Sequence, residues 1–188
     1  MANGFINTLV AFLIAGATLS FSFKAVEPSG KVMYEGSGTV LAIGDSYRME
    51  TPQMLVVSDG ETKGIYQKEI DEIVLQKVAS AGATGASAPT GSDGNLSAAN
   101  TTLQGIMDNP FAILQHAGKF YTVTTYKGGK KATSGAPGAL PDKIELRAAS
   151  GAVYTIGILD AKKEDTVDAS SFVLNLDDFP TAVVTDLR

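Results

Sequence analysis

Apolar residues near the start of the chain follow two periods in succession. The first is the spacing of one helical face, at Ile6, Leu9, Val10 and Leu13. The second is the spacing of a strand, at Leu19, Phe21, Phe23 and Ala25. Residues 5–23 carry no charge, but this change of period predicts an amphipathic helix followed by a strand and argues against a single membrane span.

A signal peptide is the alternative interpretation of the same start. The segment "FINTLVAFLI" could be the apolar part of a signal peptide, and "AGA" at 15–17 has the form of a cleavage site. However, no Lys or Arg precedes Lys24, whereas a signal peptide normally begins with a basic region. We therefore favour a helix that belongs to the folded domain.

Short extended segments follow, separated by Gly, Pro and Asp, which predicts an antiparallel meander. The first, at 31–44, contains a Gly-Ser-Gly interruption that suits a bulge or bend. The segments are "KVMYEGSGTVLAIG", "SYRMET", "MLVV", "KGIYQ" and "DEIVLQ".

The middle of the chain has a different character. Residues 79–97 are rich in Ala, Gly and Ser without periodicity, which predicts a flexible insert that carries no site. Two short helices are predicted next, from "AANTTLQGIM" at 98–107 and "NPFAILQHAG" at 109–118. The second has Asn109 as N-cap, Pro110 at the first helical position and Gly118 as its stop.

Strand patterns return after residue 118. They are "KFYTVTTY", "DKIELRA", "AVYTIGIL", "FVLNL" and "TAVVTDL". The chain is thus predicted to be α+β but mainly β, with about ten or eleven strands and about three short helices. An antiparallel sheet of this size must curl, and three helices are few to cover its concave face. The pattern therefore predicts an apolar pocket under a helical lid.

Composition limits the possible functions. The 188 residues are 44% hydrophobic with mean hydropathy +0.10, which is enough apolar material for the core of one domain. The net charge is −5, and the short lysine cluster "YKGGKK" is interpreted as a hairpin tip, so nucleic-acid binding is not expected. The absence of cysteine excludes disulfides and thiolate chemistry.

Catalytic patterns are weak. His116, the only histidine, lies at the end of a predicted helix, and no G-x-S-x-G elbow, phosphate loop or calcium loop is present. The remaining candidates are the acids Asp59, Glu61, Glu69, Asp71 and Glu72. Asp59-Gly60 is a hairpin-turn dipeptide and the others alternate with apolar residues, so we interpret these acids as a solvated face.

The order of these motifs resembles the LolA type of periplasmic lipoprotein carriers of Gram-negative bacteria. The resemblance is weaker across 79–97 and 128–139. It rests on "LSFSFKAVEPSGKVMYEGSGTV", "SYRMETP", "LVVSDGETKGIY", "NPFAIL" and "FVLNLDDFPTAVVTDLR".

The resemblance implies one LolA-like lipid-binding domain over residues 1–188, an incomplete antiparallel barrel closed by helices. It implies a monomeric periplasmic carrier that binds the acyl chains of lipoproteins in an apolar cavity. The carrier would take them from an inner-membrane ABC release complex to an outer-membrane acceptor, without catalysis, cofactor, metal or nucleic acid. Residues predicted to line the cavity are Tyr47, Met49, Met54, Val56, Ile65, Tyr66, Ile73, Leu75, Phe111 and Leu114, although each could equally be ordinary core.

Two departures from the family pattern affect the predicted cavity. Gly64 stands where the family often has Trp, which predicts a roomier or differently shaped pocket. The segment "AIGDS" before Tyr47 lacks the family's usual basic residue with proline. Cargo and lid gating therefore stay open. So do three alternatives, namely a lipid sensor or envelope-stress regulator, an enzyme acting on envelope lipids or glycans, and a structural β-domain with a filled core.

Overall fold

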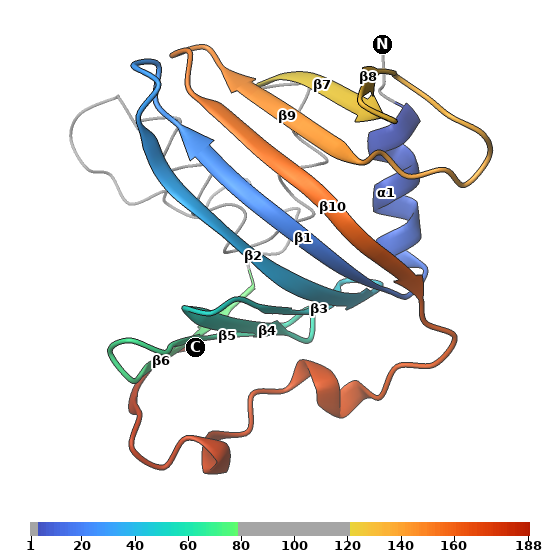
Figure 1. The fold of residues 1–188 in the computed structure, drawn as a ribbon. Coiled ribbons are helices and arrows are strands. Elements are labelled where there is room, and N and C mark those ends of the chain that lie inside the picture. The colour runs from blue at the N-terminus through green and yellow to red at the C-terminus, as the bar shows by residue number, and fades with distance from the viewer. Residues whose placement is uncertain (1–3, 79–120) are drawn as a thin grey trace, which may run out of the picture.

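The computed structural model describes residues 4–78 and 121–188, which form a curled sheet with one α-helix inside the curve (Figure 1). In chain order the elements are α1 (Gly4–Ile14), β1 (Ala17–Val26), β2 (Val32–Ile43), β3 (Ser46–Glu50), β4 (Met54–Ser58), β5 (Thr62–Gln67), β6 (Glu72–Lys77), β7 (Tyr121–Lys127), β8 (Lys130–Lys131), β9 (Lys143–Ala148), β10 (Val153–Lys163), the 3₁₀ turns η1 (Ala169–Phe172) and η2 (Leu176–Asp178), and β11 (Val183–Leu187).

All strands belong to one 11-stranded sheet, in the order β11-β6-β5-β4-β3-β2-β1-β10-β9-β7-β8. Strands β2 to β6 follow one another as an antiparallel meander, as predicted from the sequence. The chain then extends the sheet on the other side of β1, because β10 pairs with β1. Finally, β11 returns to the far edge and pairs with β6 in parallel, which the alternation of residues did not predict.

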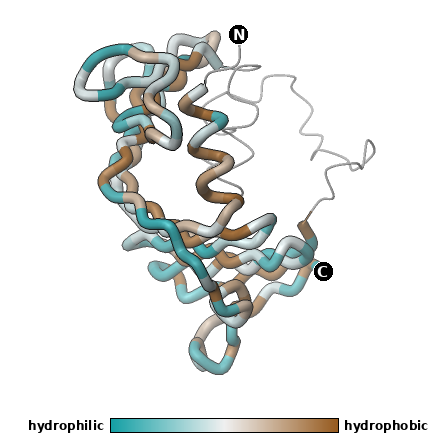
Figure 2. The backbone as a smooth tube through the Cα atoms, turned by 90° about the vertical axis from the view of Figure 1, so that its right-hand side faces the viewer, coloured by the Kyte–Doolittle hydropathy of each residue, from teal (hydrophilic) through white to brown (hydrophobic). Residues whose placement is uncertain are grey.

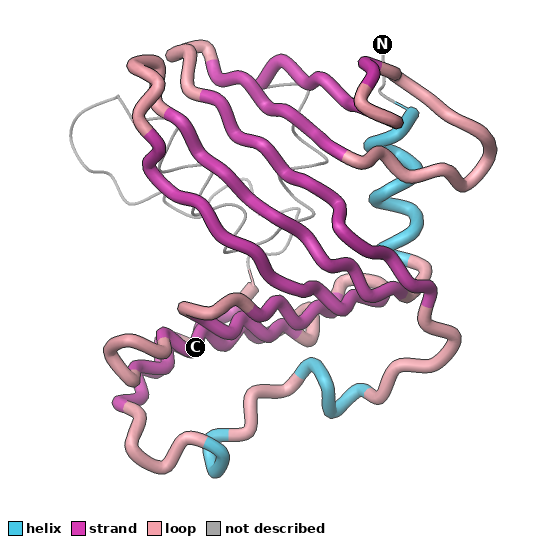
Figure 3. Tube along the Cα trace, viewed as in Figure 1, coloured by secondary structure: helices cyan, strands magenta, loops and turns pink. Residues whose placement is uncertain are grey.

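The sheet curls but does not close into a barrel (Figures 1 and 3). A register shift at Ser20/Phe21 in the β1–β10 pair adds local twist in the longest part of the sheet. The predicted curled sheet is therefore confirmed. Of the predicted three-helix lid, the structure describes only α1, because the insert at 79–97 and the helices predicted at 98–107 and 109–118 lie outside the described residues.

The helix-then-strand interpretation of the start of the chain is confirmed. The α1 helix buries Phe5, Ile6, Leu9 and Leu13 against the sheet, and the next strand begins at Ala17. Gly16 makes the change of direction with φ +104°, where a Cβ atom would lie 2.9 Å from the carbonyl oxygen of Glu164. No described helix is long and apolar enough to cross a membrane.

The expected strand at "FVLNL" is wrong. Residues 173–175 form a short loop between two 3₁₀ turns. These turns form because Asp168 and Asn175 accept hydrogen bonds from the backbone N–H groups of Ser170 and Asp177, at 2.9 and 3.3 Å. Short polar side chains of this kind stabilise turns in competition with a strand ladder. The pKa of Asp168 is lowered by its bond to Ser170.

The expected bulge at Gly-Ser-Gly is also absent, since β2 keeps its register through Gly36 and Gly38. These glycines make room for neighbours. A Cβ atom at Gly38 would lie 2.5 Å from the carbonyl oxygen of Glu50, and one at Gly36 would lie 2.9 Å from the hydroxyl of Tyr34. The interruption in the pattern therefore marks close packing.

The lysine hairpin is confirmed between β7 and β8. Gly128 and Gly129 take φ values of 57° and 73°, as a two-residue hairpin turn requires. Asp142 fixes this turn by accepting from Lys127 Nζ at 2.7 Å and from the Gly128 N–H at 2.6 Å. The bond to Lys127 is the main cause that lowers the pKa of Asp142.

Candidate functional site

The sheet has two apolar surfaces, which belong to its two faces. We call the side that carries α1 the concave face and the opposite side the convex face (Figure 2). Cross-strand register places Phe21 of β1 beside Ile158 of β10, and Val40 of β2 beside Met49 of β3, all in one core cluster on the concave face. This cluster extends from β5 to β7, so it is one continuous hydrophobic core on this face, and most of its side chains are buried.

The residues predicted to line a cavity divide between the two faces. Those on the concave face are Tyr47, Met49, Met54, Val56 and Ile65. Those on the convex face are Tyr66, Ile73 and Leu75, because their register partners belong to that face. Phe111 and Leu114 lie outside the described residues. The strand segments were therefore identified correctly, but the structure brings together only the first group on the side of α1.

The α1 helix is anchored at both ends and covers one end of the concave face. At its start the Phe5 N–H donates to the carbonyl of Thr133 at 3.2 Å, and at its end the carbonyl of Ile14 accepts from the Gly44 N–H at 2.9 Å. An eleven-residue helix is about 16 Å long, which is close to the combined width of four strand spacings, about 19 Å in total. The helix, which we call the α1 crossbar, therefore spans the sheet from the segment just after β8 to the β2–β3 turn (Figure 1).

Four aromatic rings cross the other end of the concave face. Phe23 lies 5.8 Å from Tyr34 and 6.5 Å from Tyr154, and Tyr154 lies 6.1 Å from Tyr121 between ring centroids. This aromatic row connects β2, β1, β10 and β7. Phe23 and Tyr154 in the middle of the row are buried, whereas Tyr34 and Tyr121 at its two ends are half-buried.

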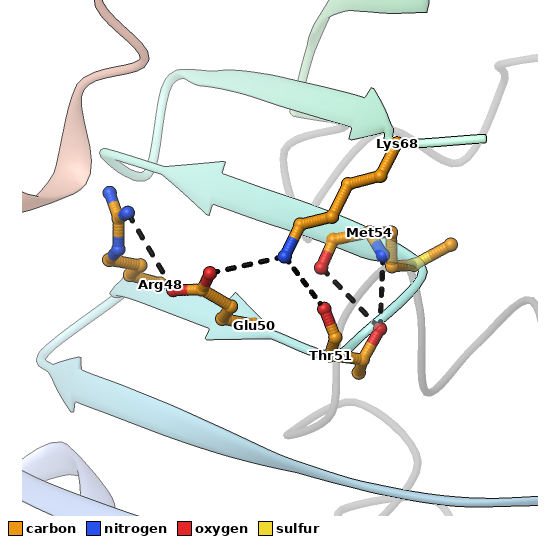
Figure 4. A network of polar contacts seen from close by, with 5 residues as sticks. All are labelled: Arg48, Glu50, Thr51, Met54 and Lys68. Carbon is orange, nitrogen blue, oxygen red and sulfur yellow. Dashed lines mark hydrogen bonds and ion pairs between the residues drawn. The ribbon is translucent and has the colours of Figure 1, made fainter. Parts of the chain in front are cut away.

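A polar network fixes the rim beside this row, at the β3–β4 turn (Figure 4). Lys68 Nζ donates to Glu50 Oε1 at 3.2 Å and to the carbonyl of Thr51 at 3.0 Å. Thr51 Oγ1 in turn accepts from the Met54 N–H at 3.1 Å. Because Met54 belongs to the concave face, this network sets where its flexible side chain enters the apolar surface.

The same turn reaches Tyr34 of the aromatic row. The Tyr34 hydroxyl donates to Gln53 Oε1 at 3.3 Å, across the rim.

Sequence reasoning missed the aromatic row because it considered alternation strand by strand. Its members do alternate with polar residues in β1 and β10, so the signal was present, but only the register of the sheet brings them together.

The convex face of β3–β6 is covered by the C-terminal strap, residues 164–182, which includes η1 and η2. Phe172 of the strap packs with Leu55 and Val57 of β4 in a second core cluster. Tyr66 and Phe179 extend this cluster with ring centroids 4.4 Å apart. Figures 1 and 3 show the strap running along the side of the sheet away from α1.

Gly64 lies on the convex face beside this cluster, and the space over it is filled, so the roomier form of the predicted pocket is wrong. A Cβ atom at Gly64 would lie 3.0 Å from Cδ2 and 3.2 Å from Cβ of Leu174, and 3.3 Å from Cδ2 of Leu75. Leu174 of the strap thus occupies the space over Gly64. The missing aromatic ring therefore changes the contact with the strap and leaves the concave face unaltered.

The acids considered for catalysis do not converge on the concave face. Asp59 accepts from the N–H groups of Glu61 and Thr62 at 2.9 and 2.7 Å and so shapes a turn. Glu69 is exposed, and Glu72 accepts from the Thr185 hydroxyl at 3.2 Å. Within residues 4–78 and 121–188 no three His, Asp or Glu side chains gather in a way that could hold a metal ion. His116 lies outside these residues.

Asp71 instead anchors the strap. It accepts from the Tyr66 hydroxyl at 3.0 Å and from the Thr181 hydroxyl at 2.6 Å, and its carbonyl accepts from the Val183 N–H at 2.8 Å. The hydrogen bond to Asp71 is the main cause that raises the pKa of Tyr66. Asp71 adopts φ 49°, which Asp tolerates better than most residues.

Comparisons with known proteins concern the fold. No family model and no curated protein matches the chain. An uncharacterized conserved protein from Thermus thermophilus superposes with a TM-score of 0.51 at 8% identity, over 97% of this chain and 96% of that one. This likeness shows a shared fold and says nothing about function.

Two further solved structures superpose less closely. One is a LolA superfamily protein from Nitrosomonas europaea, with a TM-score of 0.41 at 10% identity over 92% of this chain and 97% of that one. The other is a DUF1329 family protein from Desulfovibrio piger, with a TM-score of 0.36 at 8% identity over 89% and 95% of the two chains.

Proposed function

We propose that the protein binds acyl chains on its concave face and carries acylated lipoproteins. The observation that carries this proposal is the continuous apolar core cluster of the concave face, between the α1 crossbar and the aromatic row. A curled sheet with one apolar inner face and a helix across one end is suited to an elongated apolar ligand. The sequence resemblance to carriers of the LolA type supports the same class of ligand.

The ends of the surface suggest how a chain would lie. Both ends of α1 are fixed by backbone hydrogen bonds, so entry is favoured at the opposite end, beside Tyr34 and Met54. These side chains can adapt to a flexible chain, since aromatic rings offer a broad contact and methionine adjusts its shape. The polar rim at Lys68 and Glu50 would remain near water and near the polar part of the cargo.

The energy of this interaction suits a carrier. Burying one methylene contributes about 0.8 kcal/mol, so sheltering about eight carbons contributes about 6 kcal/mol before ordering costs. Several chains bound together would give tight binding. Release must then require a partner or a competing conformation that is costly to open.

The biological setting is part of the proposal. A carrier of this kind would work in the periplasm of a Gram-negative bacterium, between an inner-membrane ABC release complex and an outer-membrane acceptor. It would act by binding and transfer, without a chemical step. The acids that an enzyme acting on envelope lipids would need are used in turns and in anchoring the strap, so no observation favours that alternative.

The test is binding of a triacylated lipopeptide, with the same peptide lacking acyl chains as control, measured by native mass spectrometry and titration. We expect acyl-dependent binding. Tyr34→Ser should weaken it about tenfold, because a half-buried ring contributes about 1.4 kcal/mol. Tyr126→Ser is the matched control, since Tyr126 is half-buried on the convex side of β7 beside Lys143.

Two results would reject the proposal. One is equal binding of the acylated and non-acylated peptides, or binding of neither. The other is an equal loss of affinity in the two tyrosine variants, because that would show that the concave face is not where the chains bind.

A further inference from the structure

The two edges of the sheet differ in how they are protected. At one edge, β8 has only two residues, both lysines, which pair with Tyr126 and Lys127 of the longer strand β7; short charged edges discourage pairing with another chain. Edge strand β11 has five residues, Val183–Leu187, without proline or lysine. Among the described residues, β11 pairs only with β6. The β11 edge therefore has no second strand partner within the described part of the chain, and it carries neither proline nor lysine.

The side chains of β11 form an apolar stripe beside this open edge. Val183 and Leu187 are 65% and 64% exposed, and both lie on the same face as Thr185. This is the concave side, because Thr185 is the register partner of Val74, which lies beside Ile65. Two large exposed side chains on one regular edge strand are an unusual exposure for a folded domain.

The backbone of β11 offers its hydrogen-bonding groups to the outside at alternate residues. The Val183 N–H points to β6, where it donates to the carbonyl of Asp71 at 2.8 Å. Because successive residues of a strand direct their N–H and C=O groups to opposite edges, Thr185 and Leu187 also face β6. Val184 and Asp186 consequently present their backbone groups outward.

We propose that this edge binds a second copy of the chain, by antiparallel pairing of two β11 strands about a twofold axis that passes between their Thr185 residues. In this register Val184 of one copy and Asp186 of the other form hydrogen-bonded pairs, and Val183 lies opposite Leu187 of the other copy. The two Thr185 residues meet at the axis as a non-hydrogen-bonded pair, in which side chains approach closely.

Self-pairing is favoured because the stripe is self-complementary. The sequence Val-x-Thr-x-Leu places an aliphatic residue opposite an aliphatic residue at both ends and threonine opposite threonine at the centre. The register of β11 is already fixed within its own chain, since the Thr185 hydroxyl donates to Glu72 Oε1 at 3.2 Å. An isologous contact of this kind closes at two copies and does not propagate.

Charge does not oppose this pairing. Asp186 is held by Arg188 of its own chain, with Nε to Oδ1 at 2.9 Å and Nη2 to Oδ2 at 2.6 Å. In the proposed register each Asp186 lies opposite Val184 of the other copy, so the two carboxylates are not directly opposed and each is already in an ion pair within its own chain. This inference concerns the sheet edge and does not depend on the proposed lipid binding.

The test is the oligomeric state of the full chain from micromolar to millimolar concentration, by sedimentation velocity, together with residue-resolved amide exchange. We expect a dimer in which the amides of Val184 and Asp186 become protected as concentration rises. The amides of Val183 and Thr185 should be protected at every concentration, because they bond to β6. A monomer throughout this range would overturn the proposal.

Two variants make the test specific. Val184→Pro removes an outward N–H that β6 does not use, and Val183→Lys places a charge on the stripe; each should weaken the dimer at least tenfold while the fold is kept. Val32→Lys is the matched control, because Val32 is a similarly exposed valine at the start of β2. A dimer that survives both β11 variants, or that is lost equally in Val32→Lys, would assign the contact to another surface.

Discussion

Replacing Gly64 with tryptophan tests the division of the molecule into two faces. The LolA type often has tryptophan at this position, and a ring on the concave face would shape the acyl-chain site. The structure instead places Gly64 beneath Leu174 of the strap, where even a Cβ atom would lie 3.0 Å from Leu174 Cδ2. An indole ring therefore has to displace Leu174 and the strap segment that carries it.

The expected cost follows from packing. Forcing a larger side chain into a filled site typically costs about 1–3 kcal/mol, and burial of a leucine is worth about 1.5–3 kcal/mol when complete. Leu174 is only half-buried, so about 1 kcal/mol of its burial is lost. We expect Gly64→Trp to lower the free energy of unfolding by about 2–3 kcal/mol and to expose strap amides to exchange, with lipopeptide affinity unchanged.

Urea unfolding and amide exchange measure these two effects separately. Gly64→Ala is the control, because its methyl group meets only side-chain atoms of two leucines, and we expect a change within about 1 kcal/mol. Leu174→Ala should partly rescue Gly64→Trp, as expected for two residues in contact. A Gly64→Trp variant with a stable, protected strap but altered lipopeptide binding would contradict the placement of Gly64 on the convex face.

Three further predictions follow from other contacts. Leu9→Ala, in the buried face of α1, should cost about 2–4 kcal/mol in urea unfolding, whereas Ile14→Ala, 46% exposed, should cost less than about 0.5 kcal/mol. Asp71→Asn should bring the raised pKa of Tyr66 back toward its ordinary value in a spectroscopic titration. In the wild type the Tyr66–Asp71 hydrogen bond stabilises the strap fully at pH below the ordinary tyrosine pKa, and this stabilisation is lost as pH rises through the raised pKa. Because the pKa of Asp142 is lowered, the ionised carboxylate stabilises the hairpin fully at pH above the ordinary aspartate pKa, and this stabilisation is lost as pH falls through the lowered pKa. Exchange protection of the Gly128 amide should therefore drop in acid, and Asp142→Asn should abolish this pH dependence.

The sequence was sufficient to predict the elements whose order along the chain is also their order in the sheet. Strands β2 to β6 are joined by tight turns, so alternation and turn residues determine both the strands and their pairing. The helix at Gly4–Ile14 and the glycine hairpin at 128–129 were likewise predictable from local signals. Residues close in sequence determine these features, so contacts between distant segments were not needed to predict them.

Features that depend on distant contacts were not predictable in this way. The parallel pairing of β11 with β6 joins residues more than one hundred positions apart, as in the Thr181–Asp71 bond. The aromatic row depends on the register of four strands. The lost strand at "FVLNL" shows the converse case, since its alternation reflects one buried side of a strap and not a ladder partner.

One segment did contain an unused signal for the strap. Residues 54–58 form β4, which is buried at every position, so both faces of this strand must be covered. Alternating strands such as β1 need a cover on one face only, and α1 contributes to it there. A continuous apolar run in an antiparallel meander therefore predicts a second layer on the convex side. That requirement explains why Leu55 and Val57 meet Phe172 of the strap while Met54 and Val56 remain on the concave face, where the proposed ligand would lie.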